Sequence, residues 1–191
     1  VRDQGAMVRQ IGYSPKEFAQ IMIKKEGGFE KAKKLFDKSE IKPSDYHPEE
    51  VKINSAGEKY SKILGKVFEP GYDFNDYNRA SSIYWPGNKI GHGREDISKF
   101  WNSLKDIFTD IKFTIEHVGY LDESNKNPRA SIRWFLEGMH SEDSEGYGKK
   151  TNSKLFVMGI NHVELNQDGI IREWVLFDEV AIWKQILINS N

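Results

Sequence analysis

The sequence predicts an α+β fold in which helices lie on one face of a curved antiparallel sheet. Up to about residue 111 most apolar residues recur at helical spacing, and after it they alternate with polar ones, as in half-buried strands. The alternating segments are long and follow one another through turns, which is typical of an antiparallel meander. Long curved strands packed against helices form a cone, and the open end of a cone is a pocket.

The first 50 or so residues are predicted to form short helices, with a loop over residues 42–48. Residues 14–17 make a capping box with proline at the first helical position, and the glycines at 27–28 end that helix. Residues 29–36 carry the apolar side of a second helix. A further capping box at 55–58 precedes the apolar helical stripe of 60–68.

A short strand and the strongest helix of the chain come next. The strand, 81–85, ends at the turn 86–88. The helix follows two glycines that flank His92, and its apolar residues recur at steps of three and four between 97 and 108. Acidic residues at 95–96 fall in its first turn, where the helix dipole favours them.

Four strands and a final helix complete the prediction. The strands are expected at 112–120, 129–140, 154–165 and 170–178. Asp168 and Gly169 between the last two strands are a strong hairpin signal. Residues 179–189 are expected to form a short helix.

Composition excludes several classes of function. The 191 residues include no cysteine, which excludes disulfides, thiolate metal sites and a cysteine nucleophile. The balance of 28 basic and 29 acidic residues argues against nucleic acid or an acidic membrane as a partner. No run of about 18 apolar residues is present, so no membrane-spanning helix is expected. Aromatic residues make up 13% of the chain, which suggests more aromatic surface than an ordinary core needs.

The start of the chain bears on location. Residues 1–7 lack the apolar stretch of a signal peptide, so a cytoplasmic protein is expected, with a leader already removed left as the alternative. The sequence also lacks a glycine-rich phosphate loop and a Gly-x-Ser-x-Gly elbow.

The order of motifs from about Ser55 to Ile188 resembles the SnoaL-like polyketide cyclase family of the NTF2-like superfamily. The matching segments are 84–87, 92–97, 107–110, 133–140, 159–162, 168–174, 177–179 and Gln185. The chain departs from the family pattern at Thr109, where a proline is typical, and at 150–152, where a Pro-Thr-Gly turn is typical.

The resemblance implies a conical fold, with a curved antiparallel sheet around helices and a deep apolar cavity. It implies cofactor-free and metal-free acid–base chemistry, such as an intramolecular aldol closure that uses one aspartate. The partners it implies are a small apolar carbonyl-bearing molecule and a second copy of the chain, since such folds often dimerise through the exposed sheet face. Residues 55–191 would form this domain, and residues 1–54 an N-terminal helical extension.

Asp178 and His92 are the predicted catalytic residues. Asp178 follows Trp174 by four positions along one strand, so both lie on one face. If that face lines the cavity, burial would raise the pKa of Asp178 and make it a usable base. Asp178 could also cap the final helix, either in place of the acid–base role or together with it. His92 could bind a substrate carbonyl or shuttle a proton, or it could simply pack in its turn.

Aromatic and histidine side chains are the predicted cavity walls, although aromatics at such spacing are often ordinary core. They are Tyr84, Trp101, Trp134, His140, His162 and Trp174. Glu173 points away from Trp174 and, like Arg133, is expected at the surface or in an ion pair. The histidines lack metal-ligand spacing, so no metal site is predicted.

A non-catalytic binding or interaction domain is the rival hypothesis. It becomes the better one if Asp178 is used up in capping a helix and no other carboxylate enters the cavity. An isomerase or dehydratase that pairs Asp178 with a histidine is a third hypothesis.

Overall fold

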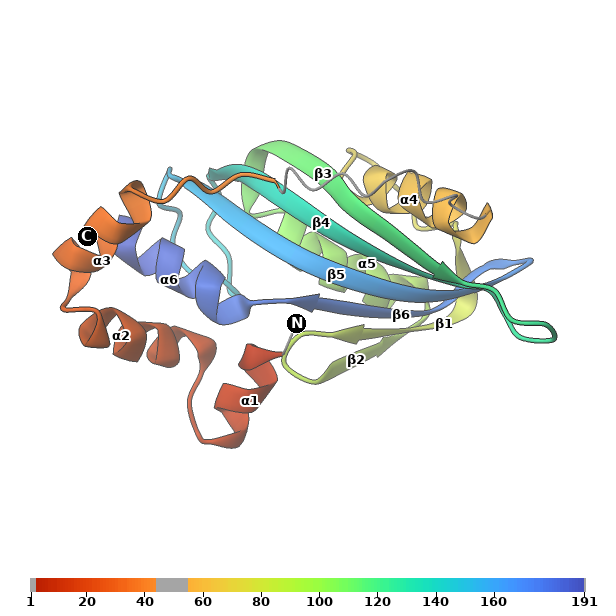
Figure 1. Ribbon diagram of the computed structural model, residues 1–191, viewed down its shortest axis with the longest axis horizontal. Helices are drawn as coiled ribbons and strands as arrows, with labels where there is room; N and C mark the ends of the chain where they lie inside the picture. Colours follow the sequence, from red (N-terminus) through yellow and green to blue (C-terminus); the bar gives the residue numbers. More distant parts are fainter. Residues whose placement is uncertain (1–2, 44–54, 191) are drawn as a thin grey trace.

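The computed structural model describes residues 3–43 and 55–190, and these form a curved six-stranded sheet with six helices (Figure 1). The predicted α+β class is confirmed, and the sheet does not close into a barrel. The helices are α1 (Gln4–Gln10), α2 (Pro15–Lys25), α3 (Phe29–Asp37), α4 (Ser55–Val67), α5 (Gly93–Lys105) and α6 (Glu179–Asn189). The strands are β1 (Tyr77–Trp85), β2 (Lys89–His92), β3 (Phe108–Leu121), β4 (Arg129–His140), β5 (Lys154–Asn166) and β6 (Gly169–Phe177).

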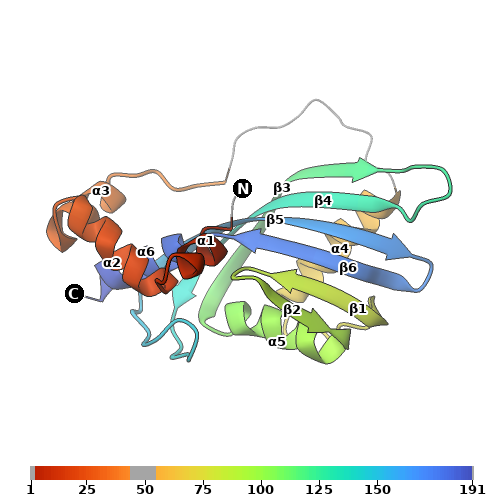
Figure 2. The same ribbon diagram turned by 90° about the horizontal axis from the view of Figure 1, so that it is seen from below.

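The strands are arranged in the order β2-β1-β6-β5-β4-β3 (Figure 2). Neighbours are antiparallel except β1 and β6, which are parallel. The predicted antiparallel meander is formed by β3, β4, β5 and β6, and the parallel pairing of β1 with β6 was not part of the prediction. After β2 the chain crosses through α5 to the far edge and then returns strand by strand, so β6 arrives beside β1 in the same direction.

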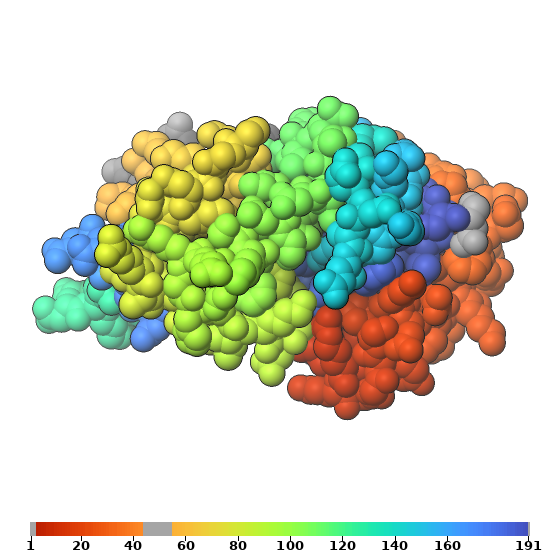
Figure 3. Space-filling view, turned by 180° about the vertical axis from the view of Figure 1, so that it is seen from behind, coloured from red at the N-terminus to blue at the C-terminus, as the bar shows by residue number. Residues whose placement is uncertain are grey.

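Helices α4 and α5 cover one face of the sheet, called the inner face below (Figure 3). The main core lies between them and the strands, and its largest fully buried side chains include Tyr60, Trp101, Trp134 and Phe177. Along β5 every second residue from Leu155 to Leu165 is buried, which gives the alternation expected of a sheet with one covered face.

The predicted boundaries hold for β4 and α6 and shift at the end of α5. Helix α5 stops at Lys105, and Phe108 already starts β3, although the helical spacing had extended to 108. Ile107 and Phe108 remain buried. An apolar residue at a helix–strand junction fits both periods, so its burial does not reveal where the helix ends. The four-residue strand β2 was not predicted.

Helices α1, α2 and α3 pack on α6 at one end of the sheet and form a second apolar cluster (Figure 1). The predicted capping box of α2 is present, since Ser14 Oγ accepts from Glu17 N–H at 3.2 Å and Ser14 N–H donates to Glu17 Oε2 at 2.7 Å. Among the helices of residues 3–43 and 55–190, none is long and apolar enough to cross a membrane.

Candidate functional site

The alternation along β6 decides which residues face the inside of the cone. Glu173, Val175 and Phe177 are buried on the inner face, and Trp174 is 39% exposed on the outer face. The expectation that Trp174 lines the cone is therefore wrong. The prediction placed Glu173 and Trp174 on opposite faces correctly, but it expected the aromatic side chain inside and the carboxylate at the surface or in an ion pair.

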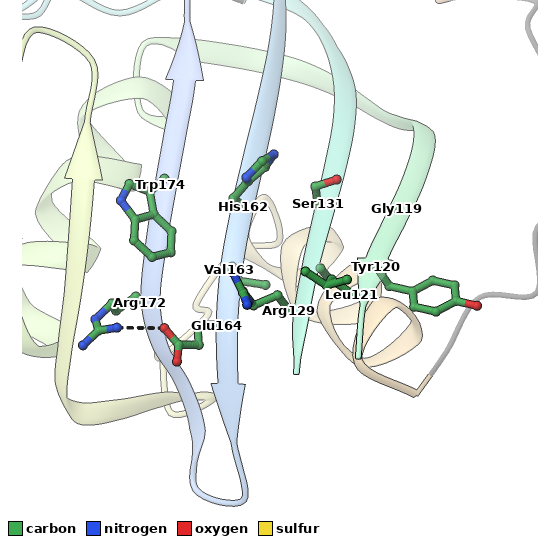
Figure 4. Close-up of a pocket in the computed structure, with 11 residues that line it drawn as sticks. Gly119, Tyr120, Leu121, Arg129, Ser131, His162, Val163, Glu164, Arg172 and Trp174 are labelled. Carbon is green, nitrogen blue, oxygen red and sulfur yellow. Dashed lines mark hydrogen bonds and ion pairs between the residues drawn. The ribbon is translucent and has the colours of Figure 1, made fainter. Parts of the chain in front are cut away.

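Six outward-facing residues form one row across the whole sheet. The registers pair Gly119 with Ser131, Ser131 with His162, His162 with Trp174, Trp174 with Tyr84, and Tyr84 with Ile90. The rings of Tyr84 and Trp174 are stacked, with centroids 5.3 Å apart and planes 8° apart. The row runs from large side chains to small ones, so the surface is hollowed over Ser131 and Gly119 (Figure 4).

A polar row lines part of the same hollow. Arg172 Nη1 donates to Glu164 Oε2 at 2.9 Å (Figure 4). On the neighbouring strand β4, Arg129 lies directly opposite Glu164 of β5. Farther along the same row, His92 Nδ1 lies 3.2 Å from Ser82 Oγ, and the His92 side chain is exposed at the start of α5. Three predicted wall residues, Tyr84, His162 and Trp174, and the predicted catalytic His92 thus lie outside the cone.

Inside the cone, a carboxylate is held by four donors from four other elements. Glu173 Oε1 accepts from Tyr60 Oη at 2.5 Å and from Asn161 Nδ2 at 2.9 Å. Glu173 Oε2 accepts from Tyr77 Oη at 2.8 Å and from Trp101 Nε1 at 3.2 Å. These five residues, called the Glu173 cluster below, come from α4, β1, α5, β5 and β6, and Glu173 itself is 0% exposed.

Asn161 organises the cluster. Its Oδ1 accepts from Trp134 Nε1 at 2.7 Å, which fixes the orientation of the amide. Its Nδ2 then donates both to Tyr60 Oη, at 2.7 Å, and to Glu173. With its oxygen accepting from Asn161, the Tyr60 hydroxyl directs its proton to the carboxylate.

Burial raises the pKa of Glu173, and its hydrogen bonds from Tyr60, Tyr77, Trp101 and Asn161 act in the opposite direction. Burial and the negative charge of Glu173 hold the pKa of Tyr60 and Tyr77 well above the ordinary tyrosine value, so both stay protonated donors. The arrangement holds a desolvated carboxylate with two phenolic donors beside it, and these group types serve in general acid–base chemistry.

Sequence reasoning missed most of this cluster. Tyr60 was assigned only to an apolar stripe, and Tyr77 and Asn161 were not singled out. One signal was present in the sequence. Glu173 lies on the same face of β6 as Val175 and Phe177, so an acidic residue stands in an otherwise apolar row. Of the predicted walls, Trp101 belongs to the cluster, and Trp134 contacts it through Asn161.

Asp178 lies at the end of β6 and caps α6. Its Oδ1 accepts from Val180 N–H at 2.9 Å and from Ala181 N–H at 3.0 Å. Burial raises the pKa of Asp178, against these two hydrogen bonds. The capping alternative is what the structure shows. Within the described residues, no group of three or more His, Asp or Glu side chains is arranged to hold a metal ion.

His140 is buried on β4 opposite Phe108, away from the Glu173 cluster. Its Nδ1 lies 3.3 Å from Thr151 Oγ1, and burial lowers its pKa.

Because the pKa of His140 is lowered in the folded protein, the unfolded chain binds a proton more readily, so stability should fall as the pH drops below about 6.5. We expect His140→Asn to cost less stability at pH 5.5 than at pH 7.5, measured by urea unfolding. A constant gap between the two proteins would contradict this.

Comparison with solved structures identifies the fold. A structure from Shewanella putrefaciens CN-32, named as a SnoaL-like polyketide cyclase, superposes with a TM-score of 0.56 at 14% identity and covers 76% of this chain and 99% of its own. IdmH from Streptomyces antibioticus, named as a polyketide cyclase, gives a TM-score of 0.55 at 14% identity and covers 70% and 99%. The chain has the fold of the SnoaL-like polyketide cyclases.

This SnoaL-like fold also occurs in AclR from Streptomyces galilaeus, named as a hydroxylase, with a TM-score of 0.51, 12% identity and coverage of 72% and 88%. No family model matches the sequence, and a search of curated proteins finds no match. Proteins with this fold are thus named for more than one type of reaction. The function of this chain therefore has to be inferred from the residues inside the cone.

Proposed function

We propose that this protein is a cofactor-free enzyme that performs general acid–base chemistry on a small, apolar, carbonyl-bearing molecule inside its cone. The observation that carries the proposal is the Glu173 carboxylate, sealed on the inner face between two tyrosine hydroxyls. The acid–base role expected of Asp178 passes to Glu173, because Asp178 caps α6.

The proposed reaction begins when Glu173 takes a proton from the carbon next to a substrate carbonyl. The C–H electron pair forms the new carbon–carbon double bond, and the π pair of the carbonyl moves onto its oxygen, which gives an enolate. A neutral carboxylic acid holds its donors less strongly than a carboxylate does, so Tyr60 and Tyr77 can turn their hydroxyl protons to the enolate oxygen. In an aldol closure the enolate carbon then bonds to a second carbonyl carbon, and the new alkoxide takes the proton back from Glu173.

The test uses 5-nitrobenzisoxazole, a general probe for desolvated bases. A base removes its ring proton, the N–O bond breaks, and a coloured nitrophenolate forms. The wild-type protein should accelerate this reaction, and Glu173→Gln should lower the rate by at least about 100-fold. Asp178→Asn, which keeps a capping side chain, should retain the wild-type rate.

The pH profile provides a second readout. Because burial raises the pKa of Glu173, the rate should increase with pH through a midpoint above 4.5, the ordinary value for the group. Glu173→Asp, which retracts the base but still accepts hydrogen bonds, should fold and react slowly. A Glu173→Gln variant as fast as the wild type would overturn the assignment.

The second candidate is a non-catalytic binding domain of the same fold. It is favoured by the saturation of Glu173, since each carboxylate oxygen already accepts two hydrogen bonds. In that case the cluster only stabilises the core, and the wild type would not accelerate the probe reaction beyond free acetate.

We also propose that a second copy of the chain covers the outer sheet face. Exposed apolar side chains gather there, among them Ile90, Met158 and Trp174. In the row from Ile90 to Gly119, the large side chains of Ile90, Tyr84 and Trp174 make one end raised, and the small residues Ser131 and Gly119 leave the other end hollow. A two-fold axis across this row would place each raised end into the partner's hollow.

Light scattering tests the proposed dimer. The wild type should show twice the chain mass of 22.1 kDa, and Trp174→Glu should shift it to the single-chain mass. The control is Ile11→Glu, an exposed apolar residue after α1, which should leave the dimer intact. A wild-type protein that is monomeric at high concentration would refute the proposal.

A further inference from the structure

A groove lies between the end of α2, α3 and α6, outside the cone and at the end of the molecule opposite α4 (Figure 1). Its volume is about 330 Å³, which is enough for a small ligand. The walls are mainly apolar and include Ala32, Leu35, Phe36, Ile41, Ala181 and Ile188. Because Leu35 is 52% exposed at the rim, a hydrocarbon chain can enter the groove from solvent.

One ion pair lies among these apolar walls. Lys184 Nζ donates to Glu26 Oε1 at 2.5 Å, and both side chains line the groove. The second carboxylate oxygen of Glu26, Oε2, is buried and has no hydrogen-bond partner among the described residues. An oxygen of this kind repels an anion, and Lys184 is already paired, so a negatively charged ligand head is disfavoured in this part of the groove.

A row of lysines runs along the rim of the groove. The residues of α3 and of the turn after it that line the groove recur at steps of three and four, and they are Ala32, Leu35, Phe36 and Ser39. Lys31, Lys34 and Lys38 each come one position before a lining residue, so they form the neighbouring row of the same helix. All three lysines are exposed, and none has an ion-pair partner within the described part of the chain. The rim therefore carries three uncompensated positive charges.

The charge of this segment differs from that of the whole chain. Residues 24–42 contain seven lysines and four acidic residues, whereas the whole chain has a net charge of -1. Two of those acids are already paired, Glu26 with Lys184 and Asp37 with Lys33. The groove and the lysines together fit a ligand with a hydrocarbon chain and a negative head. A nucleic acid would use the charge alone and leave the apolar groove unfilled.

We propose that this groove binds a single-chain anionic amphiphile of the fatty-acid class. The hydrocarbon chain lies between α3 and α6, and the carboxylate meets Lys31, Lys34 and Lys38 at the rim. The inference goes beyond the proposed function, because the groove shares no residue with the Glu173 cluster. It gives the N-terminal helices a binding role of their own.

Titration calorimetry with octanoate and 1-octanol tests the site. The two probes share a chain and differ in the head, so octanoate should bind at least about tenfold more tightly than 1-octanol. Added salt should weaken the binding of octanoate and not that of 1-octanol, since exposed charges are screened. Hexanoate, which is two methylenes shorter, should bind about 15-fold more weakly than octanoate, because each buried methylene contributes about fourfold.

Two variants separate the contribution of the head from that of the chain. The triple variant Lys31→Glu, Lys34→Glu and Lys38→Glu should lower the affinity for octanoate by at least about tenfold and leave that for 1-octanol within about twofold. Ala181→Trp fills the groove from an exposed position on α6. It should lower the affinity for both probes by at least about tenfold.

The matched control is the triple variant Lys59→Glu, Lys62→Glu and Lys66→Glu. These exposed lysines have the same spacing on α4, so the change in charge is equal but lies at the opposite end of the molecule (Figure 1). The control variant should bind octanoate like the wild type.

Several results would overturn the inference. They are no binding of octanoate by the wild type, binding of octanoate no tighter than that of 1-octanol, wild-type affinity in either groove variant, or an equal loss in the α4 variant. Octanoate bound inside the cone would respond to neither groove variant, so it is distinguished from this site. The proposed function is tested separately, because both groove variants leave the Glu173 cluster intact and should keep the wild-type rate with the benzisoxazole probe.

Discussion

Glu173→Leu is expected to lower the free energy of unfolding by about 3–5 kcal/mol, because it leaves four buried donors without an acceptor. Tyr60, Tyr77, Trp101 and Asn161 all direct a hydrogen to this carboxylate, and all come from other elements of the fold. Urea unfolding followed by tryptophan fluorescence measures the loss. Glu95→Gln, a change at an exposed carboxylate on α5, should cost less than about 0.5 kcal/mol.

A triple variant separates two contributions to the lost stability, namely the removal of the carboxylate and the burial of donors that no longer have an acceptor. Adding Tyr60→Phe and Tyr77→Phe to Glu173→Leu removes two of the unpaired donors. Part of the lost stability should return, since an apolar replacement of a whole buried network is often close to neutral. If the triple variant is less stable than Glu173→Leu, the cost lies in packing rather than in unpaired donors.

Gly159→Ala is expected to destabilise the protein by about 3 kcal/mol, because the added methyl group would overlap the indole of Trp134. Gly159 and Trp134 are directly opposite each other on β5 and β4, and the ring lies over the glycine. Displacing the ring also disturbs the hydrogen bond from Trp134 to Asn161. A fall in Tm of about 6–12 °C would correspond to this loss.

Gly65→Ala is the matched control for that prediction. Gly65 lies in α4, and a methyl group added there meets no atom within 4 Å. The change should stabilise the protein by about 0.5–1 kcal/mol, since alanine favours a helix over glycine. Equal and small effects at positions 65 and 159 would show that Trp134 is not held against Gly159.

The change of period near residue 111, from helical spacing to alternation, was enough to predict the fold class. Strand β4 and helix α6 begin and end where the sequence places them, because each is bounded by clear turn or capping signals. The parallel pairing of β1 with β6 was not predictable, because it depends on where the crossover through α5 returns the chain.

The candidate site was predicted only in part. Trp101 and Trp134 were expected to line the interior; Trp101 belongs to the Glu173 cluster, and Trp134 donates a hydrogen bond to its Asn161. Tyr84, His162 and Trp174 were expected to line the cavity, but the face of the sheet that they share is the outer one. Asp178 was recognised both as a candidate base and as a helix cap, and its oxygen accepts the two capping hydrogen bonds.

The sequence by itself determined that Glu173 and Trp174 point to opposite faces of β6, because side chains alternate along any strand. Only the tertiary structure decided which of the two faces inwards. A lone buried carboxylate is strongly disfavoured, so residue type alone assigns Glu173 to the surface. Its burial is sustained by donors as far away as Tyr60, 113 positions earlier in the chain, and such partners come together only when α4, α5 and the sheet close around them.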